Sequence, residues 1–151
     1  MGRQQPAAVT NAIAAQMALI GVSGLTTLVT AFQREELVAA WTARQPEGIT
    51  PPAFVPVAIV LFVTYALLAA VLVAFFRGGH PSARLSLTVL AAFFLFTMLV
   101  IYRQDPPTLF VVLAAISAVL DLVLIFFLWH KETGAFLRGA GIAAQRAPER
   151  G

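Results

Sequence analysis

Residues 53–76 read AFVPVAIVLFVTYALLAAVLVAFF, an unbroken apolar stretch in which Thr64 is the only conventionally polar side chain. About 20 helical residues are enough to cross the ~30 Å hydrocarbon core of a bilayer. Backbone groups in lipid must hydrogen-bond within their own segment, so a stretch of this kind is helical. Pro56 falls in the first turn, where its missing N–H costs little. The stretch therefore predicts a transmembrane α-helix.

Three further stretches of similar length and character occupy residues 12–32, 85–102 and 108–129, and Asp121 is the only charged residue in any of them. Together the four stretches predict an all-α membrane protein, a four-transmembrane-helix up-down bundle. Residues 1–130 then form a single transmembrane domain, with a loop at 33–52, and residues 131–151 form a tail. The first stretch is longer than the 7–15 apolar residues of a signal peptide, so we expect it to be a retained span.

The composition agrees with this reading, because 60% of the 151 residues are hydrophobic and only 11% are charged. Intrinsic disorder needs the opposite balance, and a soluble domain of this size needs more charge to cover its surface. The chain has no cysteine, which excludes disulfides, cysteine-bound metals and thiol redox chemistry. Its basic residues are scattered between apolar stretches, so we expect no nucleic-acid partner.

The distribution of lysine and arginine predicts the orientation, because cytoplasmic loops are richer in these residues. Seven of the ten would lie on the side of both termini and three on the other. Both termini are therefore expected to be cytoplasmic, in a multi-pass protein of the plasma (inner) membrane. The predicted cytoplasmic basic residues include Arg77, Arg84 and Lys131.

Residues near the ends of the spans have side chains suited to the membrane surface. Trp41, Tyr102 and Trp129 are predicted to be interface anchors, since amphipathic rings prefer the headgroup level. Residues 34–44 favour a short interfacial helix or an extension of the first span, forming either a packed cap or a ligand or partner surface. The tail is expected to be a short interfacial stretch that frays.

Asp121 lies 13 residues into the last span, roughly 20 Å from its outer end. An ionised carboxylate at that depth costs a few kcal/mol, so it must be neutral, paired or in contact with water. Ser117 precedes it by one turn on the same helix face. Gln16, Thr64 and Tyr65 come from the first two spans and could reach it. These five residues are the predicted intramembrane polar site.

Three interpretations of Asp121 remain open: it fixes helix packing, it binds a basic residue of another membrane subunit, or it handles protons or cations. Nothing predicts catalysis, a cofactor or a metal site. His80 and His130 have no metal-ligand spacing, no serine or threonine has a nearby histidine base, and no phosphate-binding glycine loop is present.

Two stretches resemble small four-span membrane proteins of high-GC actinobacteria. The first is SARLSLTVL at residues 82–90, and the second is VLDL at residues 119–122, followed by Leu128-Trp129 and by Phe136. That family is largely uncharacterised, so the resemblance implies a plasma-membrane location and no particular activity.

Short loops and missing catalytic groups favour a non-enzymatic role as an accessory, assembly or stabilising subunit of a larger membrane complex. The expected partners are the lipid bilayer and either other membrane subunits or further copies of this chain. The alternative is a small oligomeric ion- or proton-coupled transporter or channel that uses Asp121.

Overall fold

The structure is a computed structural model that describes residues 5–146, with side chains described for residues 5–139. Within that range the chain forms helices and no strand. The helices are α1 (Ala7–Phe32), α2 (Arg34–Thr42), α3 (Phe54–Arg77), α4 (Pro81–Tyr102), α5 (Thr108–Leu128) and α6 (Lys131–Arg146).

Four of these helices, α1, α3, α4 and α5, are long and apolar enough to cross a membrane, which confirms the predicted multi-pass architecture. Two of them begin earlier than predicted, α1 at Ala7 and α4 at Pro81. Pro6 occupies the N-cap of α1, and Pro81 is the first residue of α4. Proline favours a helix start, and each helix has one there, just before α1 and at the first position of α4.

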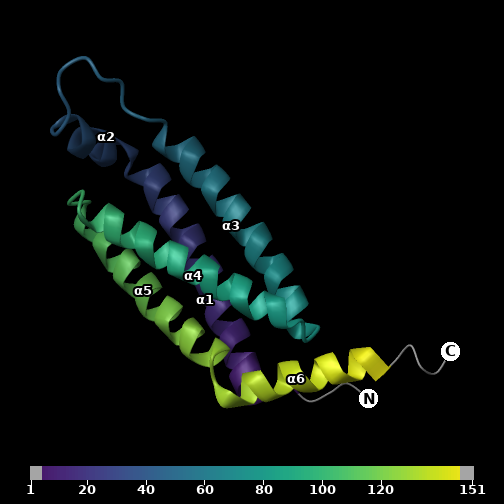
Figure 1. The fold of residues 1–151 in the computed structure, drawn as a ribbon. Coiled ribbons are helices and arrows are strands. Elements are labelled where there is room, and N and C mark those ends of the chain that lie inside the picture. The colour runs from purple at the N-terminus through teal and green to yellow at the C-terminus, as the bar shows by residue number, and fades with distance from the viewer. Residues whose placement is uncertain (1–4, 147–151) are drawn as a thin grey trace.

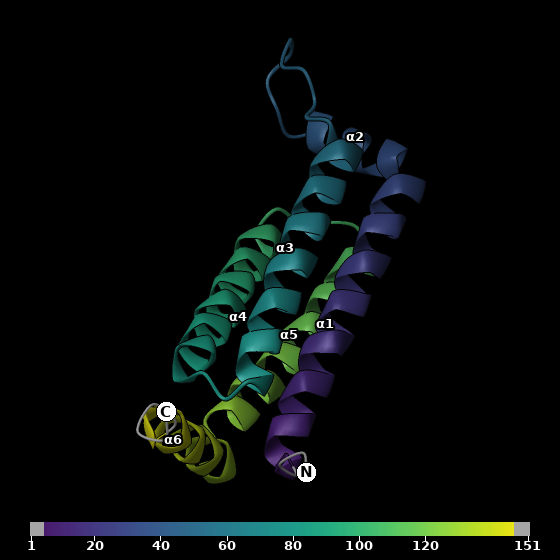
Figure 2. The same ribbon diagram turned by 90° about the vertical axis from the view of Figure 1, so that its right-hand side faces the viewer.

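The four long helices run up and down in one elongated bundle (Figures 1 and 2). The most extensive contacts join the first span to the last, α1 to α5, followed by those of α1 with α3. The α3–α4 contact is the sparsest among the pairs of long helices in contact. The start of α1 and helix α6 lie at one end of the bundle, and α2 lies at the other (Figure 1). We call these the α6 end and the α2 end.

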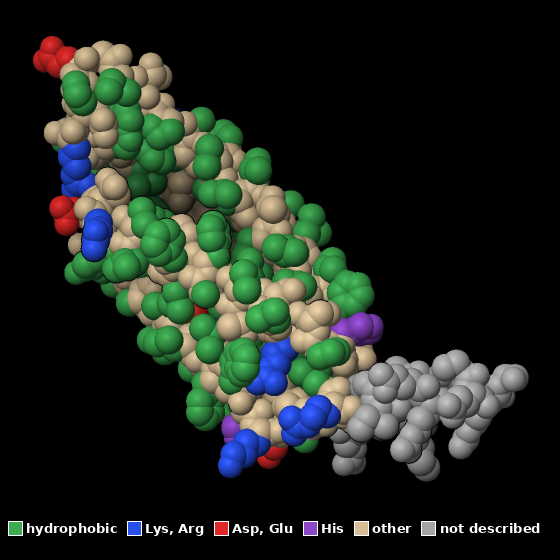
Figure 3. All heavy atoms as spheres, in the orientation of Figure 1, with side chains coloured by type: hydrophobic (Ala, Val, Ile, Leu, Met, Phe, Trp, Pro, Cys, Tyr) green, Lys and Arg blue, Asp and Glu red, His purple; other side chains and the backbone are tan. Residues whose placement is uncertain are grey.

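Six alanines are among the buried residues of the core. Alanine lets helices approach closely, which matters in lipid because association there depends on packing rather than on the hydrophobic effect. The outward faces carry many exposed leucine, valine, isoleucine and phenylalanine side chains, as expected of a surface in contact with lipid (Figure 3). The buried alanines are Ala8, Ala12, Ala15, Ala69, Ala83 and Ala91, and larger buried residues include Leu19, Phe76, Leu87, Leu124 and Leu128.

Helix α2 confirms the short helix predicted after the first span, whereas α6 corrects the expectation for the tail. Residues from Lys131 to Arg146 form a 16-residue helix across the α6 end of the bundle (Figure 1). Thr133 and Leu137, one turn apart, are both buried, and Thr133 Oγ1 donates to the Phe127 carbonyl at 2.8 Å. This packing holds the helix that we expected to fray. Residues 147–151 lie outside the described range.

Candidate functional site

Asp121 is 1% exposed and lies in the interior of the bundle, not on the lipid face. Ser117, one turn earlier on α5, is equally enclosed, and so is Gln16 on α1, the helix most extensively packed against α5. Among the described residues, Asp121 Oδ2 has no hydrogen-bond partner. A buried carboxyl oxygen without a partner is unusual and requires an explanation.

Gln16 and Tyr65 form a hydrogen bond across the bundle, from Gln16 Nε2 to the Tyr65 hydroxyl oxygen at 2.8 Å. The Tyr65 ring stacks on Phe94 of α4, with centroids 5.0 Å apart. Asp121 and Ser117 are buried on α5, the helix in most extensive contact with α1. We call the buried polar groups Gln16, Tyr65, Ser117 and Asp121 the polar cluster, and Phe94 of α4 packs against its Tyr65 ring.

The structure excludes Thr64 from this cluster. Thr64 is exposed on the outer face of α3, while the adjacent Tyr65 is buried. Neighbouring residues on a helix point about 100° apart, so only one of the two can face the interior. Depth in the membrane was predicted for both residues, but the face of the helix decides which one belongs to the site.

A cavity of about 750 Å³ extends from the α2 end toward this cluster. It lies between α1, α3, α4 and α5, and its hollow is visible between α3 and α4 in Figure 3. At its deep end it reaches Tyr65 and Ser117, and Ser117 is one helical turn, about 6 Å, before Asp121. The sequence gives no sign of this space, because it results from the packing of the four helices, among which α3 and α4 make the sparsest contact. Its aromatic lining residues are Trp41, Phe54, Phe62, Tyr65, Phe94 and Phe110.

One wall of the cavity is polar and belongs to α1. Ser23, Thr26, Thr27 and Thr30 line it with helical spacing, a pattern that could have revealed a polar face in the sequence. The three threonine hydroxyls donate to carbonyls of their own helix at 2.9–3.0 Å. Their oxygens retain lone pairs for a ligand, so this wall can accept hydrogen bonds.

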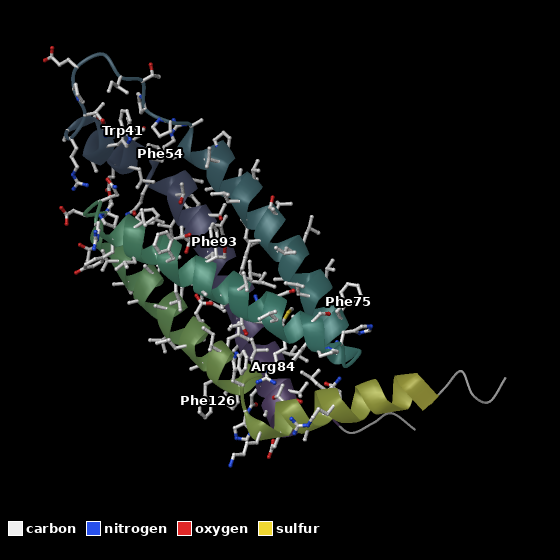
Figure 4. The ribbon with its side chains drawn as sticks, viewed as in Figure 1. Trp41, Phe54, Phe75, Arg84, Phe93 and Phe126 are labelled. Atoms are coloured by element: carbon white, nitrogen blue, oxygen red, sulfur yellow. The ribbon has the colours of Figure 1, made fainter. Side chains whose placement is uncertain are left out.

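The rim of the cavity is tied together by Arg44 and Asp105. Arg44 Nη2 donates to the Asp105 carbonyl at 3.0 Å and lies 3.9 Å from its carboxylate. Asp105 has a positive φ of 42°, which orients the α4–α5 loop for this contact. Trp41, predicted to be an interface anchor, is half-buried and lines the same opening near Phe54 (Figure 4).

The other predicted surface residues lie at helix ends. Tyr102 and Trp129 are 61% and 56% exposed, at the ends of α4 and α5. Arg77 and Lys131 are exposed at the α6 end, and Arg84 is half-buried there beside Trp129. All three basic residues are therefore at the same end of the bundle, as predicted. The structure does not contain a membrane, so the side of the membrane on which they lie stays a prediction.

Comparison of the chain with protein-family models, with curated protein sequences and with solved structures gives no significant match. The resemblance to actinobacterial four-span proteins therefore stays a prediction.

Proposed function

We propose that the protein is a small ion- or proton-coupled transporter in which Asp121 is the coupling group. The observation that carries this proposal is the cavity, which reaches Ser117 and Tyr65 next to a buried acid with an unpartnered oxygen. Intramembrane acids at the end of such a path are typical of ion and proton handling. Asp121 is enclosed, so a basic residue on the outside of the bundle cannot reach it. This disfavours the interpretation in which Asp121 binds a basic residue of another membrane subunit.

The lining of the cavity indicates the class of substrate. Aromatic rings from α2, α3, α4 and α5 surround it, and its polar wall on α1 offers hydroxyl oxygens as acceptors. Aromatic faces attract cations, and oxygen acceptors suit an ammonium group. An apolar amine or other lipophilic cation fits these surroundings, and exchange of that cation for a proton on Asp121 would couple the two movements.

Liposomes that contain the purified protein and a trapped pH indicator test the proposal. A pH gradient is imposed with and without a lipophilic amine at the outer face, and internal pH is followed. With the amine present, we expect proton movement above that of empty liposomes given the same amine, reduced to that empty-liposome rate by Asp121→Asn; without the amine, the protein should add little. Glu36→Gln, at an exposed acid of α2, is the matched control and should leave the rate unchanged. Equal rates for Asp121→Asn and the unsubstituted protein would refute the proposal.

The second candidate is an accessory or stabilising subunit of a membrane complex, in the plasma membrane with both termini cytoplasmic. It is favoured by the outward face of α4, where Phe93 and Phe96 are 66% and 63% exposed. A bulky aromatic face can pack against a helix of another subunit as well as against lipid.

A quantitative pull-down in mild detergent tests this candidate. We expect a fixed stoichiometry of one or more membrane proteins with the tagged chain, reduced severalfold by the double substitution Phe93→Ala and Phe96→Ala. Substitution of Phe126, which is 63% exposed on α5, provides the control. A chain that purifies alone and monodisperse would exclude the accessory role.

A further inference from the structure

At the α6 end, two arginines from different helices converge on a glycine. Gly134 of α6 is buried, and the point where a Cβ would stand is 3.7 Å from Arg84 Nη1 and 3.6 Å from Arg138 Nη1. Arg84 belongs to α4 and Arg138 to α6, so the two guanidinium groups meet only because α6 crosses the end of the bundle (Figure 1). Each group presents several N–H donors to the same region.

Contacts with Trp129 and Thr88 hold Arg84 in this position. Its Cζ lies 4.0 Å from the centroid of the Trp129 ring, a cation–π contact. The Trp129 Nε1–H donates to Thr88 Oγ1 at 3.1 Å, and the Thr88 hydroxyl donates to the Arg84 carbonyl at 2.9 Å. The ring and the guanidinium are therefore oriented before any ligand arrives. Figure 4 shows Arg84 close to the junction with α6.

Within residues 5–139, neither arginine forms an ion pair with an acid. The ion pair found within residues 5–139 is Arg44–Asp105, at the opposite end of the bundle. Arg84 Nε is buried and has no hydrogen-bond partner in the same range. Two guanidinium groups that both lie within 4 Å of one point repel each other, and an anion that contacts both removes that cost. Planar guanidinium groups bind phosphate through paired hydrogen bonds.

The position of the pair indicates where such a phosphate comes from. Helix α3 ends at Arg77, α4 begins at Pro81 and α5 ends at Leu128, all at the α6 end. The pair is therefore at the level where the apolar spans stop and lipid headgroups begin, with Arg77 and Lys131 exposed nearby. Anionic headgroups attract basic residues at this level.

We propose that Arg84 and Arg138 form a binding site for the phosphate of an anionic phospholipid, which links α6 to the transmembrane bundle. The site is independent of the proposed transport function, because it lies at the opposite end from the opening of the cavity. Gly134 carries no side chain, so both guanidinium groups lie against the same stretch of α6 backbone, where a phosphate can reach them together.

Titration of the delipidated protein with short-chain phosphatidylglycerol tests the site. In a Trp41→Phe background Trp129 is the only tryptophan, so its emission reports on the ring beneath Arg84. We expect a saturable change with phosphatidylglycerol and at least tenfold weaker binding of phosphatidylcholine. Arg138→Gln should weaken phosphatidylglycerol binding about tenfold, as expected for the loss of a charge-assisted contact. Arg138 is exposed, so this variant should fold.

Two further variants separate a built site from general electrostatic attraction. Arg103→Gln removes the same charge from an exposed position at the other end of the bundle and should leave binding unchanged. Arg138→Lys keeps the charge but loses the paired N–H donors of the guanidinium group, so it should weaken binding severalfold. Equal losses for Arg103→Gln and Arg138→Gln, or no loss for Arg138→Lys, would overturn the proposal. If inorganic phosphate displaces phosphatidylglycerol at a concentration equal to that of the lipid, the site would be assigned to a soluble anion instead.

Discussion

Replacement of Asp121 by leucine is expected to stabilise the protein by about 1–3 kcal/mol while it abolishes proton coupling. The carboxyl group is 1% exposed and Oδ2 lacks a partner among the described residues, so the folded state bears a desolvation cost without a compensating bond. Leucine is similar in size and would meet Leu124 and other apolar neighbours. Buried polar groups replaced by apolar ones of matching volume often give neutral or positive changes in stability.

The measurement is thermal unfolding in detergent, where a gain of this size raises the midpoint by roughly 3–10 °C for a chain of this length. Asp121→Asn is the control, because it removes the charge but keeps a polar group in the same place. The opposite hypothesis, that Asp121 fixes helix packing, predicts a lower midpoint for Asp121→Leu. A fall of several degrees would therefore support a structural role and count against a functional one.

Phe76→Ala is expected to destabilise the bundle by about 2 kcal/mol, while Phe75→Ala has little effect. The two residues are adjacent on α3, yet Phe76 is 1% exposed and Phe75 is 51% exposed. In lipid, burial of an apolar ring gains little free energy from the hydrophobic effect. The stability lost with the Phe76 ring therefore comes mainly from the cavity that it leaves behind. Phe75 faces outward, and lipid chains can fill the space that its ring leaves.

Unfolding of both variants by denaturing detergent, under identical conditions, provides the comparison. The two substitutions are chemically identical and one position apart, so any difference between them reflects the face of the helix. Equal losses of stability would mean that the bundle in solution packs α3 on a different face from the one described.

Most of the fold could be predicted from the sequence, because in lipid each span must satisfy its own backbone and its length must match the bilayer. The predicted and observed helix starts differed most at α1 and α4, where Pro6 and Pro81 mark the start of the helix. Helix α6 was missed although its sequence has an amphipathic pattern, and contacts made by Thr133 and Leu137 with the bundle hold it in place.

The candidate site could be predicted in part. Depth along each span identified Gln16, Tyr65, Ser117 and Asp121 as polar groups able to meet, and all four are buried. The prediction that Thr64 belongs to the site was wrong, because depth along a span does not specify which face of the helix a residue occupies. The cavity was not foreseen, since it depends on the distance between α3 and α4, and distances between helices are set by tertiary packing. The partnership of Arg84 and Arg138 depends in the same way on the path of α6.

The close pairing of α1 with α5 has a consequence for biogenesis. Of the four spans, α1 is synthesised before the others and packs most extensively against α5, so its principal neighbour is synthesised roughly 100 residues later, about 5–20 s at ordinary translation rates. During that interval α1 exposes the Gln16 amide and its row of small residues to lipid or to the insertion machinery. A nascent chain that stops before Thr108 therefore retains α1 without its main contact surface, and completion of the core coincides with insertion of the final span.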